Sequence, residues 1–126
     1  PEHTVLAGAF TNIGAVADYC RERNVLVVCA GWEGHVCLED ALFGAALADR
    51  LSDSHLPGSD AVRMVLDCYH LHAFDLEGAI RASDHYRRLL RVGKADALTY
   101  CLNTDISRAL PLATTDSEGR LLLRND

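Results

Sequence analysis

Several features are missing from this 126-residue sequence. No apolar run approaches the roughly 20 residues that a membrane helix needs, and the first residues, PEHT, are too polar for a secretory signal, so no membrane partner is expected. The net charge is −6 and there is no basic run, which argues against nucleic acid as a partner. Eleven of the twelve basic residues are arginine, which suits phosphate contacts, although a genome rich in arginine codons explains the same bias.

Paired cysteines are also missing. The five cysteines are odd in number and form no CxxC motif, so neither a disulfide framework nor a zinc knuckle is predicted. Most lie in apolar surroundings and are expected to behave as small core residues, which fits a reducing, cytoplasmic location. A redox role for Cys29 and Cys37 is the least favoured hypothesis, because seven residues and a predicted turn separate them.

The familiar short catalytic motifs are absent as well. The chain has no P-loop, no GxGxxG and no GxSxG, and no arginine closes the loop that follows Cys29, as a cysteine phosphatase would need. The pair His70 and His72 has no third ligand near it in the sequence, so a zinc site is not predicted there.

The first 51 residues alternate between strand-like and helical patterns. TVLAGAF (4–10) and the uniformly apolar VLVVCA (25–30) are typical of buried strands, and each precedes a helical pattern, at 13–20 and at 36–51. A β-α-β-α order predicts a parallel sheet with right-handed crossovers.

The rest of the chain is mostly helical. Helices are expected over 60–72, 75–82, 84–92 and 95–103, followed by a C-terminal β-hairpin around the turn 116–119. With 49% hydrophobic residues, 1–126 is predicted to form a single α/β unit. The expected fold class is a three-layer α/β/α arrangement, with a largely parallel or mixed sheet and the C-terminal hairpin.

Ligands of parallel sheets gather beyond the carboxyl ends of the strands, which here are the turn at Asn12 and the turn 29–34. Both turns lead into helix N-termini, which favour anions, and Gly31 and Gly34 permit close approach of the backbone. Glu39 and Asp40 follow in the first turn of the next helix. They either offset the helix dipole or bind a hard cation such as Mg²⁺. Asp60 is either a metal or water ligand or a helix cap.

Four stretches carry a family resemblance: VLAGAFTNIGAVADYC, VLVVCAGWEGHVCLEDALFGAAL, GSDAV and ASDHYRRLLRVGKADALTYCLNTDISRALPLA. They resemble the later half of the 2-phosphosulfolactate phosphatase family, the ComB-type enzymes of coenzyme M and sulfolactate metabolism. The resemblance implies an α/β/α fold and magnesium-dependent hydrolysis of 2-phospho-3-sulfolactate to 3-sulfolactate and phosphate. Family members are about twice as long, so the chain is expected to be the C-terminal half of a larger domain. Its expected partners are a small anionic phosphate ester and either the N-terminal half of the same protein or further copies of itself.

The resemblance also implies roles for individual residues. Glu39 and Asp40 match the acidic pair of the family and are the expected catalytic and magnesium-binding residues, with Asp60 as a secondary metal ligand. The expected substrate-binding residues are Asn12, Cys29, Gly31 and Gly34. One departure is His85-Tyr86, where the family has a small or amide residue and Gly, which puts a substrate contact from this loop in doubt. The alternative function is a non-catalytic α/β module that binds an anionic metabolite or a partner chain.

Overall fold

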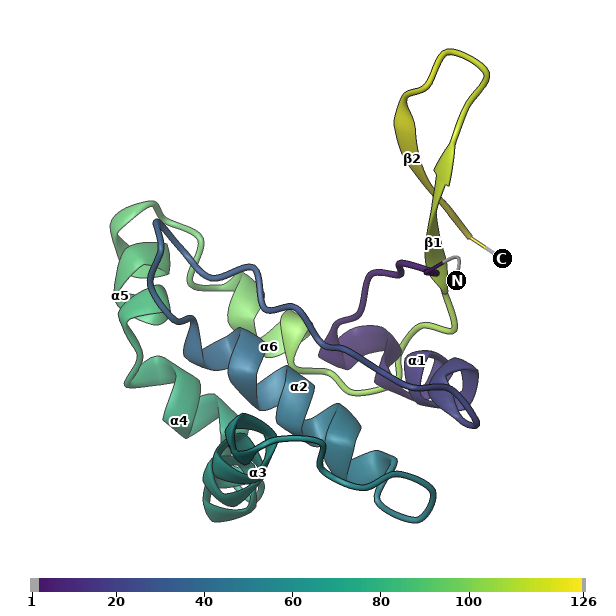
Figure 1. Ribbon diagram of the computed structural model, residues 1–126. Helices are drawn as coiled ribbons and strands as arrows, with labels where there is room; N and C mark the ends of the chain where they lie inside the picture. The colour runs from purple at the N-terminus through teal and green to yellow at the C-terminus, as the bar shows by residue number, and fades with distance from the viewer. Residues whose placement is uncertain (1–2, 126) are drawn as a thin grey trace.

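The structure is a computed structural model that describes residues 3–125 (Figure 1). It combines helix and strand and is 46% helical. In chain order its elements are a 3₁₀ turn η1 (Phe10–Asn12), α1 (Ile13–Cys20), α2 (Leu38–Arg50), α3 (Asp60–His72), α4 (Leu76–Arg81), α5 (Asp84–Arg91), α6 (Ala97–Cys101), β1 (Pro111–Thr115) and β2 (Leu121–Asn125).

The hydrophobic core lies where α1, α2, α4 and α6 meet. Its best-buried large side chains are at most 1% exposed: Ile13 and Val16 of α1, Leu42 of α2, Ile80 of α4 and Leu98 of α6. Apolar residues three or four apart supply this layer from α1 and α2, as helical periodicity predicts. Helix α3 packs against α2 without burying any residue completely. Helix α2 therefore contacts both α1 and α3 and contributes Leu42 to the core.

The strands expected at 4–10 and 25–30 do not form a sheet within residues 3–125. The only sheet there is the two-stranded hairpin, and the first segment contributes one bridge, from Leu6 to Leu112. Residues 24–30 are extended but join no ladder, and Leu26 and Val28 are 87% and 81% exposed. The expected parallel sheet is thus wrong for the described chain, and the three-layer arrangement is not confirmed. A ladder needs a neighbouring strand, and none lies beside residues 24–30 in the described part of the chain.

The C-terminal hairpin is confirmed. Strands β1 and β2 pair antiparallel, with Thr115 opposite Leu121. Asp116 organises the turn, because one of its carboxylate oxygens accepts the backbone N–H groups of Glu118 and Arg120, both at 2.9 Å. Gly119 has φ +78°, the left-handed conformation expected of glycine at this point. In Figure 1 the hairpin projects away from the helices.

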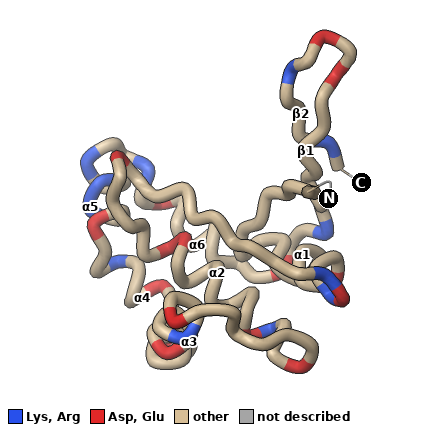
Figure 2. The backbone as a smooth tube through the Cα atoms, viewed as in Figure 1, with Lys and Arg blue, Asp and Glu red and all other residues tan. Residues whose placement is uncertain are grey.

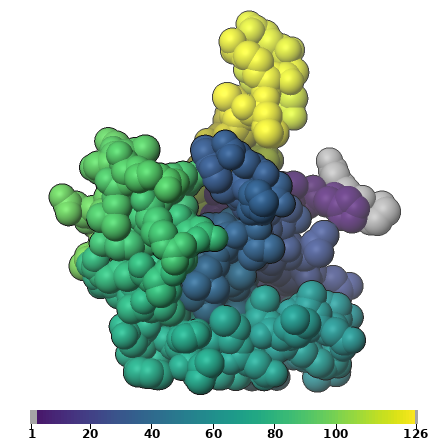
Figure 3. Space-filling model, turned by 90° about the vertical axis from the view of Figure 1, so that its left-hand side faces the viewer, coloured from purple at the N-terminus to yellow at the C-terminus, as the bar shows by residue number. Residues whose placement is uncertain are grey.

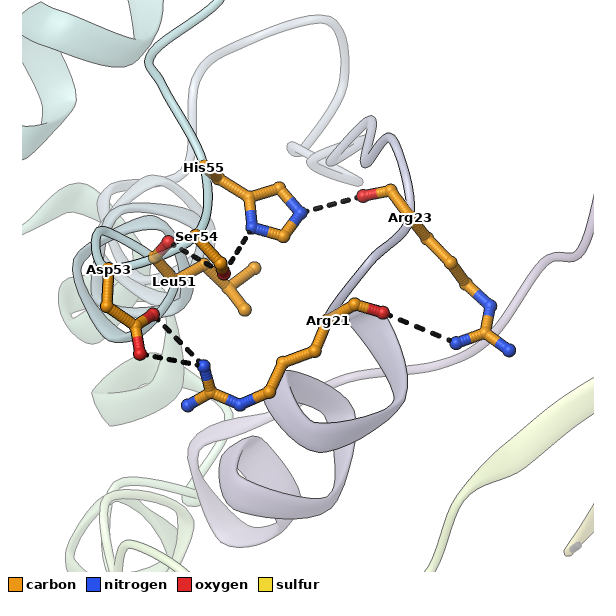
Figure 4. A network of polar contacts seen from close by, with 6 residues as sticks. All are labelled: Arg21, Arg23, Leu51, Asp53, Ser54 and His55. Atoms are coloured by element: carbon orange, nitrogen blue, oxygen red, sulfur yellow. Dashed lines mark hydrogen bonds and ion pairs between the residues drawn. The ribbon is translucent and has the colours of Figure 1, made fainter.

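A polar network ties the end of α1 to the loop after α2 (Figure 4). Arg21 donates to both carboxylate oxygens of Asp53, at 3.0 Å each. His55 Nε2 donates to the carbonyl oxygen of Arg23 at 2.7 Å, while His55 Nδ1 lies 2.8 Å from the Ser54 hydroxyl. These contacts fix the place where residues 24–30 leave α1.

No helix within residues 3–125 has the length and apolar character to cross a membrane.

The arrangement predicts very different costs for two leucines. Leu42→Ala should lower the free energy of unfolding by about 2–5 kcal/mol, because the side chain is 1% exposed and its loss leaves a cavity. Leu26→Ala should change it by less than about 0.5 kcal/mol in the isolated chain, because Leu26 already faces solvent. Urea unfolding measures both, and equal losses would contradict this placement of the core.

Candidate functional site

The turn that follows residues 24–30 is a tight two-residue turn. The Trp32 N–H donates to the His35 carbonyl at 3.0 Å, and the His35 N–H donates back at 2.8 Å. Glu33 and Gly34 between them have φ of 48° and 79°, as a type I′ turn requires. Gly31 has φ +66°, and a Cβ there would lie 2.7 Å from the His35 carbonyl oxygen. Gly31 is therefore dictated by local geometry, and Gly34 by its φ.

Asp40 anchors this turn to the start of α2. Its Oδ2 accepts the Gly31 N–H at 2.8 Å. The carboxylate thus replaces the strand neighbour that the Gly31 amide would otherwise need. Its other oxygen, Oδ1, makes no hydrogen bond within residues 3–125 and can accept a further donor or a cation.

Glu39 contacts α5. Its Oε2 lies 3.4 Å from Nε2 of His85, and the two side chains are 24% and 20% exposed. Arg88 Nη2 lies 2.8 Å from His85 Nδ1. Because arginine can only donate, Nδ1 accepts, and the neutral ring then carries its proton on Nε2, facing Glu39.

Arg88 links this chain of contacts back to the turn. Its guanidinium carbon lies 3.6 Å from the centre of the Trp32 ring, a cation–π contact. Its Nη1 is buried and has no hydrogen-bond partner within residues 3–125. The site is therefore a row from Asp40 and Glu39 through His85 to Arg88, with the turn 31–35 packed on it.

Burial raises the pKa of Glu39. Desolvation is the largest cause, the nearby His85 lowers the pKa, and the carboxylate of Asp40 raises it further. Mutual repulsion of two adjacent acids and loss of water both favour the protonated form. A bound cation would reverse that preference, so the pair suits a positive ligand.

Asn12 is engaged within the fold. It is 6% exposed, its Oδ1 accepts the Ala9 N–H at 2.8 Å, and its Nδ2 donates to the carbonyls of Ala7 and Ala109, at 3.3 Å and 2.9 Å. The side chain joins the end of the first extended segment to the segment before β1. Its expected contact with substrate stays a prediction.

The structure does not bring Asp60 to the acidic pair. It is the first residue of α3, its side chain is 97% exposed, and it pairs with Arg63 at 3.4 Å. Within residues 3–125, no group of three or more His, Cys, Asp or Glu side chains is placed to hold a metal ion. Ser59, not Asp60, caps the helix, because its hydroxyl accepts the Val62 N–H. The role of Asp60 as a metal ligand stays a prediction.

Cys29 lies beside the acids and is a free thiol, as is the buried Cys37. Although Cys29 as a whole is exposed, partial desolvation of its thiol raises the pKa, and Asp40 and Cys37 raise it further. The reactive thiolate is therefore disfavoured at neutral pH. This environment suits a contact residue better than a nucleophile.

Sequence reasoning missed Arg88, and it named His85 only within Ser83-Asp84-His85, a segment interpreted as a helix cap in preference to a contact with substrate. The structure has this cap, because the Ser83 hydroxyl accepts the Tyr86 N–H at 3.2 Å. The cap places His85 in the first turn of α5, opposite the first turn of α2. The signals in the sequence were this polar segment and the departure from the family at His85-Tyr86.

Substitutions of the two neighbours of Glu39 should shift its pKa in opposite directions. His85→Ala should raise this pKa, because it removes the group that lowers it, and Asp40→Asn should lower it, because it removes a repelling charge. Carbon-detected NMR titration of the Glu39 carboxyl measures both. A midpoint at or below the ordinary 4.5 in the unmodified chain would contradict the burial of Glu39.

The same shift predicts a pH-dependent cost to stability. Because the pKa of Glu39 is higher in the folded state than in the unfolded state, the folded state binds its proton more tightly. The free energy of unfolding should therefore fall as pH rises from the ordinary pKa through the raised one. Glu39→Gln should remove this fall, and an unchanged pH profile would contradict it.

Comparisons with known proteins show the family of the chain. A sequence model described as "2-phosphosulpholactate phosphatase" matches residues 2–116. A protein of Trichormus variabilis named "Probable 2-phosphosulfolactate phosphatase" is 35% identical over 118 residues, covering 86% of this chain and 48% of that protein. Proteins with the same name from Gloeobacter violaceus and Thermotoga maritima are 34% and 28% identical, over 87% and 85% of this chain and 47% of each relative.

The chain spans about half the length of the curated relatives that it matches. The family model, by contrast, matches nearly all of this chain. The matched residues include Glu39, Asp40 and the turn 31–35. The chain therefore belongs to the 2-phosphosulfolactate phosphatase family.

Proposed function

We propose that this chain supplies part of the active site of a magnesium-dependent phosphatase that hydrolyses 2-phospho-3-sulfolactate to 3-sulfolactate and phosphate, in the cytoplasmic metabolism of sulfolactate and coenzyme M. The observation that carries the proposal is the position of the two acids. In a chain of this family, they stand together at the front of α2, against the turn 31–35. The reducing compartment fits five cysteines that are all free thiols.

The donor set fits Mg²⁺ in part. Magnesium in proteins usually takes one or two carboxylates and completes its shell with water and substrate phosphate. Asp40 has one oxygen free of hydrogen bonds within residues 3–125. Glu39 is half-buried, and a cation beside it would lower the free-energy cost of ionising its carboxyl group. When bound, Mg²⁺ neutralises developing charge on the phosphate oxygens and orients the ester.

The chain also offers groups for an anion. The backbone N–H groups of Leu38, Glu39 and Asp40 precede the first hydrogen bond of α2, from the Ala41 N–H to Cys37, and the helix dipole adds positive potential there. Arg88 places a cation against His85 and has one buried nitrogen without a hydrogen-bond partner within residues 3–125. A substrate that carries phosphate, carboxylate and sulfonate needs such local donors in a protein with a net charge of −6.

Each side chain then has a distinct task. Asp40 holds the turn through Gly31 and keeps one oxygen free of hydrogen bonds within residues 3–125, while Glu39 supplies the second carboxylate. His85 keeps Glu39 in place through its Nε2, and Arg88 fixes the ring of His85 from the other side. In a site of fixed charges and N–H groups, the ester bond breaks without reorganisation of water around the phosphate.

The alternative is a non-catalytic module that binds an anionic metabolite or a partner chain. The observation that favours it is that, within residues 3–125, two carboxylates stand without a third ligand. The two functions differ in turnover, not in binding, so an activity assay separates them.

The test measures phosphate release from 2-phospho-3-sulfolactate by this chain, alone and mixed with the part of the Trichormus variabilis relative that lies outside the matched 118 residues. Turnover should need Mg²⁺ and stop with chelator. Glu39→Gln and Asp40→Asn should each lower kcat/KM by about 100-fold or more, because the cation contributes several kcal/mol to charge stabilisation.

The matched control is Asp67→Asn, an amide change at an exposed carboxylate of α3 that should leave the rate unchanged. Substrate that binds without ever turning over, in either preparation, would favour the non-catalytic module. A mixture that keeps its rate and magnesium dependence in the Glu39→Gln, Asp40→Asn double variant would contradict the proposed site.

A further inference from the structure

We propose that the groove between residues 4–9 and 24–30 receives one extended apolar segment, which pairs with both edges and turns them into a continuous sheet. The groove has a volume of about 1030 Å³. It is lined along one side by residues 3–11 and along the other by 23–30, so its walls are two stretches of extended backbone. This inference goes beyond the proposed function and does not depend on phosphatase activity.

The first wall already has one paired edge. The Ala7 N–H donates to the Pro111 carbonyl at 3.0 Å, and the Ala113 N–H donates to the Val5 carbonyl at 2.8 Å. In a strand, the N–H and C=O groups of one residue point to the same edge, and the groups of successive residues alternate between the two edges. The N–H and C=O groups of Leu6 and Gly8 therefore point away from the hairpin and have no partner within residues 3–125.

The second wall has two open edges. No backbone N–H or C=O of residues 24–30 takes part in a main-chain hydrogen bond within the described chain. These residues carry no charge, as the uninterrupted tan tube of Figure 2 shows. In Figure 3, dark blue atoms from this part of the chain and the turn that follows it lie at the surface, beside the green helices. An apolar run with every main-chain group unpaired is a template for strand addition.

The floor shows that the two walls belong to one layer. A Cβ on Gly8 would lie 2.6 Å from the Phe43 ring, and a Cβ on Gly44 would lie 3.2 Å from Val27. The two walls thus press on adjacent residues of α2, yet no hydrogen bond joins them, so they are not strand neighbours at the usual spacing of about 4.8 Å. A helix about 10 Å across spans two such spacings, which leaves room for one strand between the walls.

The occupant is an uncharged β-strand from the part of the family domain that this chain does not match. The curated relatives are about twice as long as the matched region, so they contain polypeptide that can supply it. The walls offer main-chain donors and acceptors and aliphatic side chains, which recognise extended backbone and not a charged metabolite. Glu39 and Asp40 also line the groove, so the inserted segment reaches the acidic pair.

The experiment is residue-resolved amide hydrogen exchange by NMR. The chain is measured alone and with the purified part of the Trichormus variabilis relative outside the matched 118 residues. The amides of Leu6 and Gly8 and alternate amides of 24–30 should exchange about 100-fold more slowly in the complex. The Ala7 amide, already bonded to Pro111, should change little.

Two proline variants test whether a single strand inserts. Neighbouring N–H groups face opposite edges, so one of Leu26→Pro and Val27→Pro should weaken binding at least about tenfold more than the other. Val27→Ala corrects for the packing of Val27 on Gly44. Equal effects of the two prolines would overturn the proposal.

Three further outcomes would also overturn it. One is the absence of a complex, and another is a complex that leaves the Leu6 and Gly8 amides unprotected. The third is protection of the same amides in the chain alone with dimer mass by light scattering, which would assign the groove to a second copy. Loss of turnover with intact protection would contradict only the proposed function.

Discussion

The hydrogen bond from the Gly31 N–H to Asp40 holds the site together. It ties the end of the extended segment 24–30 to the first turn of α2, at 2.8 Å. Without it the Gly31 amide would lose its partner, and the turn 31–35 would have only its own two hydrogen bonds and the stacking of Trp32 on Arg88 to hold it. The same bond orients Asp40, so Glu39, about 100° further round the helix, must face α5.

That orientation explains why Glu39 is unusual. A carboxylate in a half-buried position loses water, and the neighbouring Asp40 repels it, so its pKa rises. His85 offsets part of this cost from α5. Acids that a fold leaves short of positive partners are common at functional sites, because a ligand supplies what the fold omits. We infer that a cation does so here.

Local patterns predicted the helices well and the sheet poorly. The helix expected at 60–72 has those bounds, the helix expected at 36–51 runs from 38 to 50, and the hairpin around Asp116 is confirmed. These elements depend on capping residues, apolar spacing and turn chemistry within the segment itself. The run 25–30 is extended, as its β-branched residues predict, but pairing depends on a neighbour that its own sequence cannot specify.

The same distinction holds within the site. The pair Glu39 and Asp40 and the glycines of the turn could be found from spacing alone, because they lie within ten residues of one another. The contact of His85 with Glu39 could not, since the two residues are 46 positions apart and only the packing of the helices brings them together. Asn12 was correctly placed at the end of an extended segment, but its engagement with Ala109 required the structure.

Glu39 and Asp40 line the groove between residues 4–9 and 24–30. The acids that are short of positive partners therefore lie beside the main-chain groups that lack hydrogen-bond partners within residues 3–125. The most direct measurement of the central claim is a titration of the isotope-labelled chain with Mn²⁺, a paramagnetic ion with similar ligand preferences to Mg²⁺. The amide signals of Gly31, Glu39 and Asp40 should broaden first, and excess Mg²⁺ should restore them. Earlier broadening at Asp60 or Asp67, with Gly31 unaffected, would contradict it.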